Sequence, residues 1–140
     1  MLRKLAIAAA TMTLLVGYTI ADDESPLEKL MEQIQNKTNA IRKVTRNAAE
    51  YKKGASSIAK DTEVILKLAK ESRDFKEPAE KEKKPFAEWQ KLTDEMIHAT
   101  EELAKVAADS KSTQAQAKEA FTTYTKTCSA CHNVFKKDDK

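Results

Sequence analysis

Apolar side chains recur at steps of three and four residues along four stretches of this 140-residue chain. This repeat constrains the fold more than any other feature, because it places the apolar side chains on one face of a helix. The chain has only two glycines and three prolines, and aromatic residues make up 6% of it. Such a composition favours helices over a sheet or barrel. The predicted fold class is therefore all-α.

The first stretch begins at Pro26, a residue that suits the first position of a helix because its missing N–H loses no intrahelical bond. Ser25 and Glu28 have the spacing of a capping box. Gly54 is the predicted end of this helix, about seven turns later. The apolar stripe consists of Leu27, Leu30, Met31, Ile34, Ile41 and Val44.

Three further helices are predicted at residues 57–72, at residues 86–108 after Pro85, and from Thr113 to the end of the motif described below. Residues 73–84 are charged, contain Pro78 and lack an apolar repeat, which predicts a connection. Four one-sided helices bury their stripes together as an antiparallel up-down-up-down four-helix bundle. Many inward positions are Ala, Thr or Ser, so the predicted core is thin.

The N-terminus has the organisation of a secretory signal peptide over residues 1–21. Arg3 and Lys4 precede an apolar run, which ends in small residues at Ala21. The uncharged run is shorter than the roughly 20 residues that span a bilayer. We therefore expect a domain of residues 22–140 in the periplasm, without a membrane anchor after cleavage. Loss of Arg3 and Lys4 lowers the formal charge from +3 to +1. Basic and acidic residues are interspersed along the rest of the chain, which indicates no nucleic-acid partner.

Both cysteines and one of the two histidines lie in the segment Cys128-Ser129-Ala130-Cys131-His132. On an ideal helix Cys131 lies about 60° and His132 about 40° to either side of Cys128, so all three share one face, which is expected to open into the bundle interior. C-x-x-C-H is the attachment signal for c-type haem, since two thiols one turn apart can each add to one porphyrin. The cofactor predicted is haem c, with His132 as axial ligand of the iron.

Other uses of this segment are less well supported by the sequence. A thioredoxin-type pair needs a βαβ setting, which the helical pattern does not provide. A zinc site needs about four ligands, and only His98 remains to join the three. A disulfide across two residues would constrain little of the unfolded chain. A haem-free helical adaptor with an incidental cysteine pair remains an alternative.

Residues 128–136, Cys-Ser-Ala-Cys-His-Asn-Val-Phe-Lys, resemble the cytochrome c′ family, whose attachment motif lies near the end of the last helix of a four-helix bundle. The helix of Trp89 and residues 63–68 add weaker similarity. Lys136 departs from the arginine usual in that family. The resemblance implies an exported monohaem protein that is not an enzyme, and it covers the whole chain after the signal.

The resemblance also implies two alternative functions, which depend on the sixth position of the iron. Met31 is the candidate sixth ligand, because the first helix is similar to that of a related b-type bundle cytochrome. A His/Met pair would make an electron carrier. Leu30 or Ile34 over an open iron would instead permit binding of NO or CO, as in a gas sensor or scavenger. Met96 belongs to an ordinary apolar stripe.

Three aromatic residues of the last helix, Phe121, Tyr124 and Phe135, are predicted to pack against the haem. Trp89 is a predicted core residue, and His98 points away from the stripe of its helix and is expected at the surface. No nucleophile–base pair or carboxylate dyad indicates catalysis. The expected partners are redox proteins of the exported compartment, and the resemblance also admits a homodimer.

Overall fold

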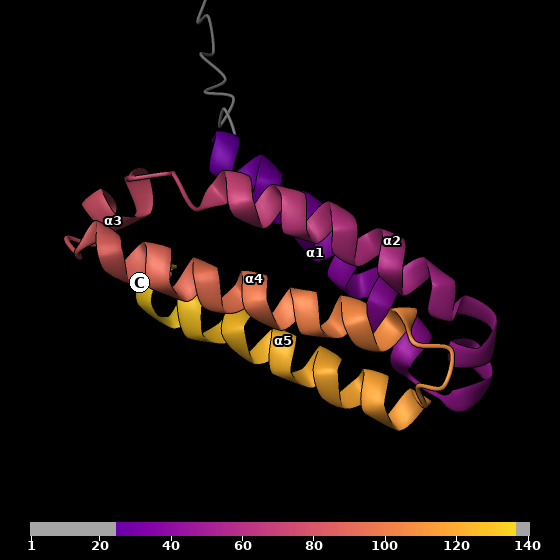
Figure 1. Ribbon diagram of the computed structural model, residues 1–140. Coiled ribbons are helices and arrows are strands. Elements are labelled where there is room, and N and C mark those ends of the chain that lie inside the picture. The colour runs from indigo at the N-terminus through magenta and orange to yellow at the C-terminus, as the bar shows by residue number, and fades with distance from the viewer. Residues whose placement is uncertain (1–24, 137–140) are drawn as a thin grey trace, which may run out of the picture.

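The computed structural model describes residues 25–136, which form four long helices and one short helix (Figure 1). The long helices pack antiparallel, α1 along α2, α2 along α4 and α4 along α5. This arrangement confirms the predicted four-helix bundle. The helices are α1 (Pro26–Thr45), α2 (Ala48–Ser72), α3 (Glu77–Lys81), α4 (Phe86–Ala108) and α5 (Gln114–Phe135).

The boundary between the first two helices differs from the prediction. The first helix ends at Thr45 instead of near Gly54, and α2 starts at Ala48 instead of near Ser57. The Asn47 side chain accepts a hydrogen bond from the backbone N–H of Glu50, and this N-cap starts α2. Gly54 lies inside α2, where a Cβ atom would be 3.0 Å from Cγ2 of Val44 on α1. The glycine thus allows the two helices to approach closely.

The predicted connection at residues 73–84 contains the short helix α3. Pro78 lies in its first turn, where the proline ring is compatible with a helix. Lys83, in the turn that follows, has a left-handed φ of 52°. Buried Ala79 packs this segment against the start of α4. Five residues are too few to show an apolar repeat, which is why the sequence pattern did not reveal this helix.

The core consists of two clusters of buried side chains. The main cluster fills most of the bundle and includes Ile41, Ile58, Ile65, Leu103 and Tyr124. The end cluster consists of Ala79, Trp89 and Phe135, with Leu27, Met31, Phe86, Leu92, Cys131 and Val134 packed against it. Trp89 stacks edge-on against Phe135 at 5.3 Å and donates its indole N–H to the carbonyl of Ser72. The end cluster thus joins the last turns of α5 to α1, α3 and α4.

Several buried positions of the bundle are threonines. Each of Thr38, Thr62, Thr93 and Thr100 donates its hydroxyl to the carbonyl four residues earlier in its own helix. Among residues 25–136, no buried side-chain nitrogen or oxygen lacks a hydrogen-bond partner. The thin core expected from the sequence therefore contains polar side chains whose hydrogen bonds are satisfied locally.

The predicted signal peptide at residues 1–21 lies outside the described residues. Within residues 25–136, no helix is long and apolar enough to cross a membrane.

Candidate haem attachment site

The cysteine pair lies in the last two turns of α5. This helix starts with the predicted capping box, in which Thr113 and Gln116 each bond the other's backbone N–H. Cys128 and Cys131 are both half-buried free thiols. Cys128 packs against the main cluster and donates to the carbonyl of Tyr124 at 3.7 Å, whereas Cys131 packs against the end cluster. The two thiols therefore lie one turn apart, where the two clusters meet.

Burial keeps both thiols protonated at neutral pH. It raises the pKa of Cys131 to about 11, with a smaller contribution from Cys128 nearby. Burial also raises the pKa of Cys128. A reactive redox cysteine needs a stabilised thiolate. The described residues also contain no cluster of three or more His, Cys, Asp or Glu side chains suited to a metal ion. The raised thiol pKa values weaken the redox alternative.

His132 differs from the expectation, because it is exposed instead of facing the bundle interior. It lies about 60° around the helix from buried Phe135, at the edge of the apolar stripe. Partial desolvation, together with the nearby charge of Lys136, lowers the pKa of the imidazole. A neutral imidazole has a free nitrogen lone pair and can bind a metal ion.

The three aromatic residues of α5 occupy different surroundings. Phe135 is in the end cluster beside Cys131. Tyr124, one turn before Cys128, is fully buried and shares a 2.8 Å hydrogen bond with the hydroxyl of Thr38 on α1. Burial raises the pKa of Tyr124 well above its ordinary value. Phe121 lies about 10 Å along the helix from Cys128, since each residue adds 1.5 Å. Haem packing stays a prediction for all three residues.

On α1, Met31 is half-buried and packs against both core clusters. Leu30 and Ile34 are buried in the main cluster on either side of it in sequence. Contacts between α1 and α5 are sparse compared with those of the other neighbouring pairs. Met31 and the cysteines are thus on the two adjacent long helices with the sparsest contacts, at the end cluster that they share.

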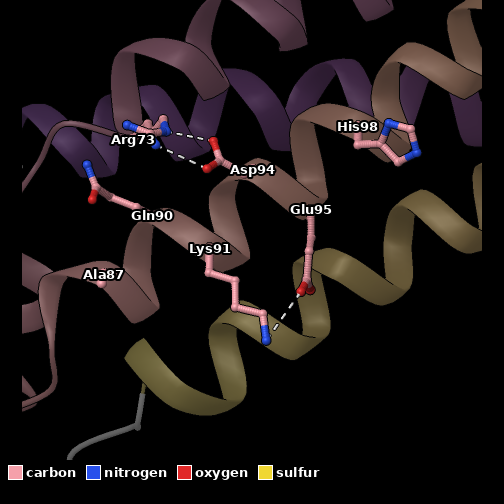
Figure 2. Close-up of a pocket in the computed structure, with 7 residues that line it drawn as sticks. All are labelled: Arg73, Ala87, Gln90, Lys91, Asp94, Glu95 and His98. Carbon is pink, nitrogen blue, oxygen red and sulfur yellow. Dashed lines mark hydrogen bonds and ion pairs between the residues drawn. The ribbon is translucent and has the colours of Figure 1, made fainter.

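Met96 and His98 lie on α4, as expected. Met96 is buried in the main cluster and His98 is exposed. A shallow pocket beside His98 is lined mainly by charged side chains of α4 (Figure 2). Arg73 binds Asp94 through two hydrogen bonds, and Lys91 pairs with Glu95. Neither cysteine lines this pocket, so it is separate from the attachment motif.

Residues 25–136 match a family model described as Cytochrome C′. The chain belongs to the cytochrome c′ family. Members of this family are generally haem proteins without enzymatic activity, and they are typically periplasmic. Searches of curated proteins and of solved structures give no match.

The side chains of this cytochrome c′ family member fit a covalently attached haem. Two protonated thiols one turn apart are consistent with a C-x-x-C-H site, and the adjacent imidazole is neutral and accessible. The surrounding side chains are mainly apolar and aromatic. Sequence patterns identified most of them as helix-stripe residues, but Ala79 was missed because α3 was not recognised.

Proposed function

We propose that this protein is a monohaem c-type cytochrome that carries electrons in the periplasm. The observation that carries the proposal is the pair of free thiols beside His132 at the end of α5 in a cytochrome c′ family member. Haem attached there would supply one-electron redox chemistry. Redox proteins of the same compartment are the proposed partners.

Each residue of the motif has a defined part in this proposal. Cys128 and Cys131 would hold the porphyrin through thioether bonds and fix it relative to α5. His132 would bind the iron through its imidazole. The apolar side chains of the end cluster would keep water from the group, which helps to set the reduction potential. Phe121, Tyr124 and Phe135 are proposed as packing residues.

Met31 is the proposed sixth ligand. Its half-buried side chain already lies at the junction of the two clusters, which is where Cys128 and Cys131 lie. Methionine is unbranched and flexible, so its thioether can change rotamer without moving the helix. With sulfur bound, the iron would have no open position, as an electron carrier requires.

The haem proposal is tested by producing the full chain in a host that attaches haem and measuring its mass. We expect one added porphyrin mass and no free thiol. The Cys128→Ser/Cys131→Ser variant should lose the added mass and still be helical by circular dichroism. Unmodified protein with two free thiols would contradict covalent attachment.

The sixth ligand is tested by absorption spectra of the reduced protein with and without carbon monoxide. We expect a low-spin spectrum that the gas leaves unchanged. Met31→Leu should become high-spin and bind the gas, whereas Met96→Leu on α4 should keep the original spectrum as the matched control. If the unsubstituted protein binds carbon monoxide, the alternative of an NO or CO sensor or scavenger is favoured and Met31 is not the ligand.

A further inference from the structure

Charge is unevenly distributed over the surface of the bundle. Residues 36–60 include seven basic side chains and one acidic side chain, Glu50, whereas residues 61–102 include eight basic and twelve acidic. Of these two segments, only residues 61–102 show the mixture of basic and acidic side chains expected from the sequence. Since residues 36–60 form the second half of α1, the first half of α2 and the turn between them, the positive excess lies at one end of the bundle.

Five exposed side chains form what we call the basic surface: Arg42, Lys43, Arg46, Lys52 and Lys53. Among residues 25–136 none of them makes an ion pair, although Lys37, Arg73, Lys91 and Lys105 all do. Arg46 is the C-cap residue of α1, four residues after Arg42, and like charges at this spacing repel each other. Arg42 lies 5.9 Å over the ring of Phe121 and donates to Asn39, and basic side chains suit the last turn of a helix. Folding does not account in this way for Lys52 and Lys53, which lie near the start of α2.

The basic surface is far from the attachment motif. The side chain of Gln114, at the start of α5, donates to the carbonyl of Thr45 at the end of α1. Cys131 is seventeen residues further along α5, which corresponds to about 25 Å. The turn between α1 and α2 lies at the opposite end of the bundle from the C-terminal end of α5 (Figure 1). A partner bound to the basic surface would leave the motif uncovered.

We propose that the basic surface binds the anionic phospholipid headgroups of a membrane, without insertion. Specific protein interfaces are centred on aromatic or other large anchors. The basic surface offers no such anchor: its exposed neighbours include Ala48 and Ala49, and the exposed large apolar side chain of the described residues is Val64, further along α2. Flexible lysines and arginines suit a dense, flat layer of phosphates, and each contributes about fivefold to binding.

The test is co-sedimentation of the mature chain with vesicles at about 0.1 M salt, where charges remain effective over about 10 Å. We expect binding to vesicles that contain phosphatidylglycerol and none to pure phosphatidylcholine. The variant Lys43→Gln/Arg46→Gln/Lys52→Gln/Lys53→Gln should lower the partition coefficient at least tenfold. All four replaced side chains are exposed, so the variant should stay helical by circular dichroism.

A matched control removes four exposed lysines elsewhere, Lys70→Gln/Lys81→Gln/Lys83→Gln/Lys84→Gln, and so has the same net charge. It should keep its vesicle binding. Equal losses in both variants, absence of binding, or equal binding to phosphatidylcholine would each overturn the proposal. Tighter binding to soluble polyglutamate than to the anionic vesicles would overturn it in favour of an acidic protein partner. The measurement does not depend on haem, so its failure leaves the proposed function unaffected.

Discussion

The hydrogen bond between Tyr124 and Thr38 connects α5 to α1, the adjacent long helices with the sparsest contacts. Thr38 also donates to the carbonyl of Ile34, so the hydroxyl of Tyr124 is the donor to Thr38. Tyr124 is fully buried, and water cannot replace the lost partner in a variant. The bond is therefore expected to contribute measurably to stability.

We expect Tyr124→Phe to lower the free energy of unfolding by about 1 kcal/mol, the typical net value of one hydrogen bond. Urea denaturation measures the change. Thr38→Val removes the other partner, and the double variant should lose less than the sum of the two single changes. Strict additivity would show that the two hydroxyls do not interact.

Glu28 contributes to the pH dependence of stability through the N-cap of α1. Its carboxylate accepts from the backbone N–H of Ser25 at 2.7 Å, and its own N–H donates to the Ser25 hydroxyl. The hydrogen bond from the Ser25 backbone, with a smaller contribution from the Ser25 side chain, holds the pKa of the Glu28 carboxyl below its ordinary value of 4.5. The unfolded chain thus binds the proton more readily than the folded protein does. The stabilisation is therefore present above pH 4.5 and is lost as the pH falls through the lower pKa that Glu28 has in the folded protein.

We expect Glu28→Gln to have a shallower fall in melting temperature below pH 4.5 than the unsubstituted protein. Thermal denaturation by circular dichroism between about pH 3 and pH 6 checks this. Glu32→Gln, at another exposed position of α1, is the control and should follow the unsubstituted curve. Parallel curves for all three proteins would refute a role of the capping carboxylate.

At the scale of the helices, Gly54 decides how closely α1 and α2 approach. Alanine is favoured over glycine in a helix by about 1 kcal/mol. However, a Cβ atom at position 54 would be 3.0 and 3.2 Å from the two methyl groups of Val44, and a valine side chain in a helix has little rotamer freedom. The contact therefore opposes the gain in helix propensity.

We expect Gly54→Ala to lower the melting temperature of the unsubstituted protein and to raise it in a Val44→Ala background. In the Val44→Ala background, the gain in the free energy of unfolding should approach about 1 kcal/mol, because only the higher helix propensity of alanine then contributes. Differential scanning calorimetry of the four proteins measures both. The same sign in both backgrounds would show that Val44 does not limit the approach of the helices.

The helices show what a sequence pattern can and cannot predict. The starts of α1, α4 and α5 followed from their capping boxes or prolines, because these signals are local. Gly54 was misinterpreted because a glycine that ends a helix and one that allows close packing have the same local signal. His132 was placed on the correct helix, but its exposure depends on which neighbours cover the edge of the stripe, and this is a tertiary property.

For the whole molecule, the sparse contacts between α1 and α5 predict where a bound haem would stabilise the fold. We expect hydrogen exchange at the start of α1 and the end of α5 to be slower in the haem-loaded protein than in Cys128→Ser/Cys131→Ser. Exchange in the first half of α2, which is remote from the motif, should be similar in both. Mass spectrometry of peptic fragments measures the difference, and uniform protection across the bundle would contradict a local effect.

Buried Thr38, Thr62, Thr93 and Thr100 have a consequence for how this bundle can adjust. Each hydroxyl bonds within its own helix, so its bond moves with that helix. Apart from α1 and α5, which the bond between Tyr124 and Thr38 couples, neighbouring helices can therefore slide or roll against one another without leaving these threonine hydroxyls unpaired in the interior. A rigid planar guest could be accommodated between them at the expense of a few side-chain rotamers, while the polar interior stays intact.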